Sequence, residues 1–461
     1  MLNNGHSGMR RAVNPQGVPV LPGSSAAVVA GGFVFTGSML AFGPDLRLHL
    51  ASRVNRDSVP EADPLELQAA VLMQNLRATL GAAGSDIGRD VLRIWQWTTA
   101  RYPSNEDYEF GPIVWPPFHS GDGYARVAKT MLDSLRTSTG IGVRQLPLSD
   151  GCFAVDVLAV LPRDGEVKQG FPDNEADDVL PFVSTIRFGD WVTTAAGPSD
   201  FRGDWKASIR AGEPSLVAMD ARVNPYIWLG SEIEAQTEWT LSRLAAAAQR
   251  AGTDLQRCVY ADVTLCHPSD YQGFDRVWRR WFPAGPPARK VTTGARIVVK
   301  GVRVEIALFM SSIDSTLERE AIEVGSVAPP IGHAPHAVRV GELLFVSTRL
   351  PLDATHSVPT RLRRDDGQRF LKRTAYEQAK EVLQDLSQIC DAARTEIANV
   401  CKAQIFMDDL DHLPDLLDAW AETFPNDPPA LAVMGMGGGQ PLLAPHAMLQ
   451  LDAIAWVPPR P

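Results

Sequence analysis

The sequence lacks the features of proteins that bind nucleic acids or membranes. Acidic residues outnumber basic ones by 54 to 44, and the formal net charge of −10 argues against a nucleic-acid partner or an anionic membrane surface. No apolar run approaches the length of a membrane-spanning helix, and the polar N-terminus does not resemble a signal peptide. We therefore expect a cytoplasmic protein with no nucleic-acid or membrane partner.

Cysteine is also scarce. The five cysteines form no Cys-x-x-Cys pair, and their odd number predicts free thiols in a reducing compartment. His333 and His336 have a spacing compatible with a metal site, but neighbouring prolines predict a loop and no Cys or carboxylate stands at ligand spacing. There is no dinucleotide-binding fingerprint and no Gly-x-Ser-x-Gly elbow. We expect neither a metal nor a cofactor.

What the sequence does contain is an internal repeat. Three glycine-led apolar segments begin at Gly32, Gly189 and Gly341. Each is followed by a helix pattern with apolar or small residues at i, i+3, i+4 and i+7. These positions are Ala69, Leu72, Met73 and Leu76 in the first repeat, Thr237, Thr240, Leu241 and Leu244 in the second, and Ala379, Val382, Leu383 and Leu386 in the third.

Each repeat continues with a strand, a second helix and a closing pair of strands. The resulting β-β-α-β-α-β-β order predicts an α+β fold, with one antiparallel-rich sheet that carries both helices on one face. Polar, turn-rich stretches at 163–178 and 311–326 predict domains at 20–163, 178–311 and 326–461, after a flexible N-terminal arm at 1–19.

The first repeat also carries an insertion, Tyr102–Tyr124, that is rich in prolines and aromatic residues. A loop of this length in a compact domain is often functional, and it could form a wall or lid of a pocket. Packing on the surface is the alternative interpretation.

The segment Pro286–Phe309 contains the pair of residues with the clearest chemical use. β-branched residues at 291–293 and 297–304 predict two strands that are joined by a short loop. In such a hairpin, Arg289 and Glu305 would approach each other. A guanidinium matches a carboxylate ligand, and a Glu can accept a proton or orient a water. A structural Arg–Glu pair at a strand edge is the alternative.

The run Pro287-Ala288-Arg289, followed by Val-x-Val-Glu at 302–305, resembles the signature of the RidA (YjgF-type) reactive-intermediate deaminases. The resemblance extends from residue 20 almost to the end, and it implies a chorismate-mutase-like fold for each repeat. Members of this family form homotrimers with active sites between subunits. Three fused copies are therefore expected to close a pseudo-trimer within one chain, which would be a monomer or a weak homo-oligomer.

The resemblance also implies roles for individual residues. Arg289 is expected to hold a substrate carboxylate and Glu305 to place the attacking water, which makes both candidate catalytic residues. The candidate substrate-binding residues are Phe182, Asp275, Val291, Thr292 and Ser347, and the first or the third repeat is expected to complete the pocket.

Only the second repeat has both residues of the family's pair. The first repeat has Ser138 and Asp156 at the two positions, and the third has Leu431 and Gln450. The second repeat also departs from the family at Val291, which replaces a residue that is usually Cys, at Asp275, which replaces an Asn, and at Ala195, which replaces a Ser.

Asp275 would weaken the binding of a carboxylate by repulsion. This effect would be removed if Asp275 is protonated, if it is paired with Arg276 or Arg279, or if the substrate carries an amine.

Three functions are compatible with these features. The leading hypothesis is a cofactor-independent enzyme that hydrolyses or deaminates a small carboxylate-bearing imine or enamine. The second is a specialised biosynthetic hydrolase, lyase or isomerase similar to the chorismatases, which resemble fused RidA-like domains. The third is a small-molecule-binding or chaperone-like protein without turnover.

Overall fold

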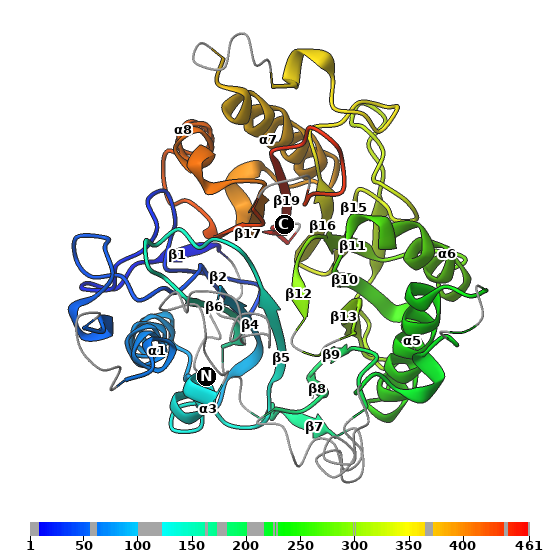
Figure 1. The fold of residues 1–461 in the computed structure, drawn as a ribbon, viewed down its shortest axis with the longest axis horizontal. Helices are drawn as coiled ribbons and strands as arrows, with labels where there is room; N and C mark the ends of the chain where they lie inside the picture. The colour runs from blue at the N-terminus through cyan, green and yellow to red at the C-terminus, as the bar shows by residue number, and fades with distance from the viewer. Residues whose placement is uncertain are drawn as a thin grey trace.

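The strands of the protein form three sheets around a common centre. The computed structural model describes residues 9–55, 62–99, 122–161, 165–172, 182–200, 216–224, 226, 229–297, 299, 301–364, 372–437 and 441–459. Figure 1 shows three units in which the helices lie on the outer rim and the strands lie toward the middle. Each unit corresponds to one repeat of the sequence.

Apart from β12, the described helices and strands follow the same order in each domain. The first domain contains β1 (Arg11–Val13), β2 (Ala27–Ala30), β3 (Phe33–Thr36), α1 (Pro64–Ala83), β4 (Val91–Thr98), α3 (Asp122–Ala128), β5 (Thr137–Gly142) and β6 (Phe153–Val160). The second contains β7 (Gln169–Phe171), β8 (Thr185–Phe188), β9 (Trp191–Ala196), α5 (Glu232–Arg250), β10 (Cys258–Leu265), α6 (Tyr271–Trp281), β11 (Ala288–Thr292), β12 (Arg296–Ile297) and β13 (Val304–Ser311). The third contains β14 (Arg319–Ile322), β15 (Ala337–Val340), β16 (Leu343–Arg349), α7 (Thr374–Ala392), β17 (Val400–Met407), α8 (Leu413–Thr423), β18 (Ala430–Gly435) and β19 (Leu449–Trp456).

The long helices α1, α5 and α7 confirm the predicted periodicity. All twelve predicted positions on these helices are buried. Helix α5 begins after Ser231, whose hydroxyl accepts a hydrogen bond from the Glu234 N–H at 3.4 Å, as in a capping box. Within the described ranges, no helix is both long enough and apolar enough to cross a bilayer.

The inner faces of the three sheets share one core. In each sheet one pair of strands is parallel (β4 with β5, β10 with β11, β17 with β18), and a helix connects its two strands, as a parallel pairing requires. One face of the second sheet packs on α5 and α6, and the opposite face meets the other domains. Phe35, Phe309 and Phe345 belong to this shared core. The chain therefore folds as the predicted α+β pseudo-trimer.

The segments that the sequence analysis treated as an arm and two linkers each contribute an edge strand. β1 pairs with β2, β7 with β8 and β14 with β15, all antiparallel. The prediction of a flexible arm is thus wrong for Arg11–Val13, because these residues find main-chain partners on β2. The first and third domains have the order β-β-β-α-β-α-β-β, with one strand more than expected, and the second domain has in addition β12, which pairs with β5 of the first domain.

The first residue of β14, and the residues directly before β1 and β7, also bring a cationic side chain to a neighbouring domain. Arg10 Nε donates to Val400 O at 2.8 Å, Lys168 Nζ to Val91 O at 3.0 Å, and Arg319 Nε to Cys258 O at 3.3 Å. The three acceptors are the first residues of β17, β4 and β10, which occupy equivalent places in the three domains. We call this repeated contact the cationic clasp. The clasp of Arg10 joins the first domain to the third and so closes the ring.

The cationic clasp predicts a loss of stability for Arg319→Met. Arg319 Nη2 also donates to Gly285 O at 2.9 Å and to Pro286 O at 2.7 Å, so the change leaves several carbonyls of the second domain without a donor. We expect a loss of about 2 kcal/mol, measured as a lower urea midpoint. The control is Arg276→Ala, which removes an exposed ion pair with Glu234 and should cost under about 1 kcal/mol. Equal midpoints for the two variants would contradict the structural role of the clasp.

Candidate functional site

Arg289 and Glu305 do not form the predicted hairpin, because β10 lies between their strands. Arg289 on β11 is aligned with Ala261 of β10, and Glu305 on β13 is aligned with Thr264. Ala261 and Thr264 are separated by an odd number of positions, and side chains alternate along a strand, so Arg289 and Glu305 point to opposite faces of the sheet. The hairpin prediction is therefore wrong.

Arg289 lies between the second and third domains, and its guanidinium is already bound. Nη1 donates to Asp275 Oδ1 at 2.8 Å, while Nη2 donates to Tyr271 Oη at 2.7 Å and to Ile331 O at 3.0 Å. The Arg289 side chain is only 1% exposed. A guanidinium in this setting holds a carboxylate firmly because little water competes for it.

Helix α6 surrounds this guanidinium with aromatic rings. The guanidinium carbon of Arg289 lies 5.6 Å from the ring centre of Tyr271 and 5.3 Å from those of Phe274 and Trp278. The three rings share one face of α6 because they occur at i, i+3 and i+7. The aromatic faces stabilise the cation and exclude solvent from it.

Asp275 is paired with two arginines. Its Oδ1 binds Arg289, and its Oδ2 accepts from Arg279 Nε at 2.8 Å. Burial disfavours the charged carboxyl, but Arg289, with Arg279 and the His333 N–H, lowers the pKa of Asp275 below its ordinary value. Of the two arginines that the sequence offered as partners, it is Arg279 that binds Asp275, whereas Arg276 binds Glu234.

The third domain completes the surroundings of β11. Ser347 Oγ accepts from the Arg289 N–H at 3.0 Å, and the Val291 N–H donates to Thr348 Oγ1 at 3.0 Å. Gln450 Nε2 donates to Val291 O at 2.9 Å. The structure thus brings Arg289, Asp275, Val291 and Ser347 together, and the partner domain is the third. Sequence reasoning missed Tyr271, Ile331 and Thr348 because no motif marks them.

Gln450 occupies in the third domain the place that Glu305 occupies in the second. Glu305 is aligned with Thr264 of β10, and Gln450 with Phe406, the equivalent residue of β17. In the first domain the same register gives Ala154, opposite Trp97, and not Asp156. The sequence-based assignment to Asp156 was therefore two residues too far along β6. At the interface that contains Arg289, the position of the family's Glu is therefore occupied by Gln450.

The remaining candidates lie elsewhere. Phe182 precedes Val183, whose N–H donates to Arg136 O of the first domain at 3.1 Å, so Phe182 lies between the first and second domains. Thr292 is buried on the same face of the sheet as Glu305, and its Oγ1 has no hydrogen-bond partner among the described residues. The insertion at Tyr102–Tyr124 lies outside the described residues up to position 121.

Glu305 faces the first domain. Burial raises the pKa of Glu305 to about 8, while Arg93 and a hydrogen bond to Thr139 oppose this rise and Asp262 adds to it. Arg93 and Thr139 belong to β4 and β5 of the first domain. Glu305 and Arg289 therefore face different neighbouring domains.

A buried ion network connects the inner faces of all three sheets. Arg93 Nη2 lies 3.2 Å from Asp262 Oδ2, and Lys290 Nζ lies 3.0 Å from Asp262 Oδ1. Lys290 Nζ also donates to Gln404 Oε1 of the third domain at 2.7 Å. Burial disfavours the Asp262 carboxylate, but Lys290 and Arg93 lower its pKa. Sequence analysis missed this network, because Arg93 and Asp262 lie singly within apolar strands and no motif links them to Lys290.

The same network joins the third domain to the first. Lys402 Nζ forms an ion pair with Asp156, and Gln404 Nε2 donates to Asp156 Oδ2 at 2.8 Å. Trp97 Nε1 is a further donor to Asp156. The Asp156 side chain is fully buried, so it depends on donors from both domains.

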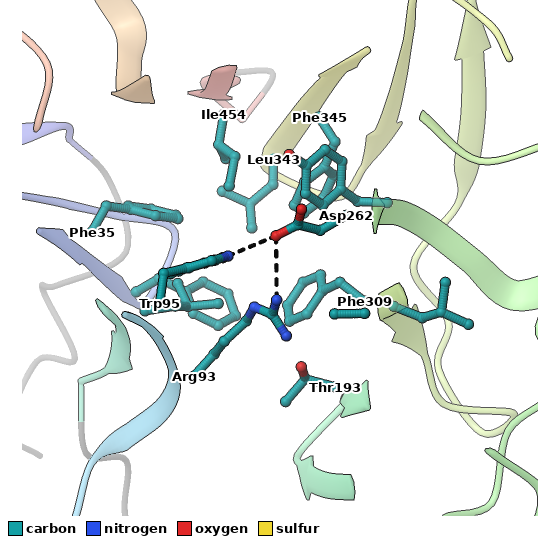
Figure 2. Close-up of a pocket in the computed structure, with 14 residues that line it drawn as sticks. Phe35, Arg93, Trp95, Thr193, Asp262, Phe309, Leu343, Phe345 and Ile454 are labelled. Atoms are coloured by element: carbon teal, nitrogen blue, oxygen red, sulfur yellow. Dashed lines mark hydrogen bonds and ion pairs between the residues drawn. The ribbon is translucent and has the colours of Figure 1, made fainter. Parts of the chain in front are cut away.

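A small cavity lies where the three inner faces meet (Figure 2). Figure 2 shows Arg93 and Trp95 directed at Asp262, with Phe35, Phe309 and Phe345 around them. Thr193 of the second domain lines this cavity at the position where the other two domains have Phe35 and Phe345. Its volume of about 30 Å³ admits only water-sized molecules, so it is not a substrate site.

The two histidines that were considered as metal ligands have other partners. His333 Nε2 lies 2.7 Å from Phe282 O, and His336 Nδ1 lies 2.8 Å from Glu323 Oε2. In the described part of the chain, no group of three or more His, Cys, Asp or Glu residues is arranged to hold a metal ion.

The endoribonuclease L-PSP family matches residues 217–311 and 325–457, which cover most of the second and third domains. A RutC family protein of Pyrococcus abyssi is 23% identical over 140 residues, or 30% of this chain and 98% of that protein. Another RutC family protein, from Sinorhizobium fredii, is 29% identical over 113 residues, or 24% of this chain and 81% of that protein. The chain belongs to the RidA-type family.

The solved structures that resemble this chain include a RidA protein and a chorismatase. The crystal structure of RidA from an Antarctic Psychrobacter species matches 30% of this chain and 99% of its own, with 19% identity and a TM-score of 0.24. A crystal structure of a chorismatase matches 80% of this chain and 93% of its own, with 11% identity and a TM-score of 0.47.

The ion network predicts that Lys402→Met destabilises the protein strongly. The change leaves the Asp156 carboxylate buried without a cation, which should cost about 3–5 kcal/mol and lower the urea midpoint. Adding Asp156→Asn should recover part of this loss, because a neutral amide can still accept hydrogen bonds from Trp97 and Gln404. If the double variant is no more stable than Lys402→Met, the unpaired carboxylate is not the cause of the loss.

The raised pKa of Glu305 predicts that the free energy of unfolding decreases as the pH rises. Its pKa is raised from 4.5 to about 8, so between these values the folded chain keeps a proton that the unfolded chain releases. The contribution is therefore complete below about pH 4.5 and is lost as the pH rises to about 8. Asp452, whose pKa burial raises to about 7, acts in the same direction. Urea midpoints from about pH 5.5 to 8.5 should fall less steeply for Glu305→Gln than for the wild type, and equal slopes would contradict the assignment.

Proposed function

We propose that this RidA-type protein is a cofactor-independent enzyme that hydrolyses a small carboxylate-bearing imine or enamine between its second and third domains. Arg289 is the anchor for the substrate carboxylate. The observation that carries the proposal is that the Arg289 guanidinium, 1% exposed and surrounded by aromatic rings, already binds a carboxylate, that of Asp275, at 2.8 Å. Membership of the RidA-type family supports imine deamination at the level of the family.

The surroundings of Arg289 suit a planar, anionic ligand. A guanidinium offers parallel N–H donors that match a carboxylate, and the rings of α6 keep competing water away. Fixing the carboxylate fixes the distance of the neighbouring C=N carbon from the groups of the third domain. Such positioning contributes proximity and orientation, which can lower a barrier by several kcal/mol.

The reaction itself needs only water. Water adds to the carbon of the C=N bond and its proton passes to the nitrogen; the resulting amino alcohol then loses ammonia and leaves a 2-oxo acid. With the substrate carboxylate on Arg289, Asp275 would accept the proton of the attacking water, because its carboxylate lies beside Arg289 at this interface. Glu305 does not take this role, because its side chain lies on the other face of the sheet.

A second candidate site is the interface between the first and second domains. It is favoured by one observation, the pKa of about 8 that keeps the Glu305 carboxyl protonated at neutral pH beside Arg93 and Thr139. A neutral carboxyl of this kind can donate a proton to a leaving group. This site would suit the specialised hydrolase or lyase better than simple imine hydrolysis. A protein that binds carboxylates without turnover is the third possibility.

Imine hydrolysis by the wild type and by Arg289→Ala tests the proposal. An amino-acid oxidase generates 2-imino acids in the presence of semicarbazide, and an active protein should suppress the trapped product. We expect Arg289→Ala to lose about 10²-fold or more in kcat/KM, or about 3 kcal/mol, because the carboxylate contact is lost. Arg289→Lys, which keeps the charge but not the paired donors, should fall between the two and guards against misfolding.

Two controls separate the candidate sites. Arg276→Ala removes a nearby exposed arginine on α6 and should leave the rate unchanged. Glu305→Gln should also leave it unchanged if the reaction occurs beside Arg289. Loss of activity in Glu305→Gln with activity retained in Arg289→Ala would move the reaction to the first interface. Absence of wild-type activity across a broad amino-acid panel would refute imine deamination.

A further inference from the structure

We infer that Asp275 is an intramolecular ligand that occupies the carboxylate subsite of Arg289, so that a substrate must displace it. This inference rests on the proposed role of Arg289 as a carboxylate anchor. It assigns Asp275 as a residue that determines specificity, because a ligand must bind better than a carboxylate that the protein itself supplies.

Asp275 is placed between a buried arginine and an exposed one. The Arg289 side chain is 1% exposed, the Asp275 side chain 12% and the Arg279 side chain 53%. The carboxylate therefore bridges the inner guanidinium and the molecular surface. A ligand that arrives from solvent meets Arg279 first and reaches Arg289 by taking the place of Asp275.

The segment 331–333 of the third domain covers the same carboxylate. Ile331 O accepts from Arg289 Nη2 at 3.0 Å, and the His333 N–H donates to Asp275 Oδ1 at 3.3 Å. Between them, Gly332 has a φ of +76° and lies so close that a Cβ atom would come within 2.6 Å of Asp275 Oδ1. Only glycine permits this approach. Displacement of Asp275 therefore requires this segment to give up its contacts as well.

A tethered carboxylate competes strongly with free ones. Because Asp275 is fixed on α6 next to Arg289, its effective concentration there is on the order of millimolar or higher. A simple monocarboxylate gains no contact that Asp275 lacks, so it should bind the wild type poorly. A ligand that binds must add contacts beyond its carboxylate, for example hydrogen bonds to groups of the third domain.

Chemical rescue tests the occupied subsite directly. In Asp275→Ala the buried Arg289 loses its carboxylate, and we expect a lower thermal midpoint that formate restores in a saturable manner. Chloride at the same ionic strength should restore little, because a single spherical ion cannot bind Arg289 and Arg279 through two oxygens as a carboxylate does. The wild type should not respond to formate. The double variant Asp275→Ala/Arg289→Met should not respond either, since the guanidinium is absent.

Asp275→Asn provides a second test that does not depend on a destabilised variant. The amide keeps the shape of the side chain but removes its charge. We expect the dissociation constant for pyruvate, a 2-oxo acid, to fall about tenfold or more relative to the wild type in isothermal titration calorimetry. Arg276→Ala is the matched control on the same helix and should bind pyruvate like the wild type.

Three results would overturn the inference. They are a formate effect on Asp275→Ala that chloride reproduces, an equal response of the double variant, and pyruvate binding by the wild type that is as tight as that of Asp275→Asn. None of these measurements depends on turnover. Tighter pyruvate binding by Asp275→Asn, together with no imine hydrolysis by the wild type, would support the subsite and refute deamination. Imine hydrolysis by the wild type, together with no tighter binding by Asp275→Asn, would support deamination and refute the subsite.

Discussion

The buried charges on the inner faces of the sheets are the interaction on which the rest of the structure depends. Asp262 of the second domain is held by Lys290 of its own sheet and by Arg93 of the first domain. Lys402 of the third domain is paired with Asp156 of the first. In a domain separated from the others, these charges would be exposed to solvent or would lose their partners. An unpaired buried charge is costly. The three repeats therefore depend on one another, and the cationic clasp repeats this dependence at the outer edges of the sheets.

Covalent fusion allows equivalent positions to differ, and this chain uses that freedom at each interface. Arg289 is equivalent to Ser138 and Leu431, since these residues are aligned with Ala261, Ile94 and Ala403 of the three central strands. One interface thus has a guanidinium, one a hydroxyl and one a leucine that is part of the apolar core. The Glu position varies independently, so that the interface with Arg289 has Gln450 and the interface with Glu305 has no arginine at the corresponding place. In the described interfaces, the two functional groups of the family's pair are separated.

Sequence patterns predicted most of the fold but only part of the site. The repeat and the long helices follow from local periodicity, which needs no knowledge of neighbours. The hairpin of β11 and β13 failed because adjacent strands in sequence need not pair, and β10 provides a parallel partner for β11 instead. The strands β1, β7 and β14 are short and partly polar, and only their pairing makes them strands. Ile331, Thr348 and Gln450 reach Arg289 through domain packing, which a single sequence does not encode locally.

The pairing of Asp275 with Arg289 follows from the same constraint that governs the inner network. A guanidinium that is 1% exposed needs an anion at all times, whether or not a ligand is present. A protein whose only anion is the substrate would bear an unpaired buried charge in its empty state. Asp275, four residues before Arg279 on α6, supplies this charge and so stabilises the ligand-free interface, at the cost of competition with any ligand. The carboxylate that makes the interface stable is thus also the one that a ligand must replace, which couples the stability of this interface to its selectivity for ligands.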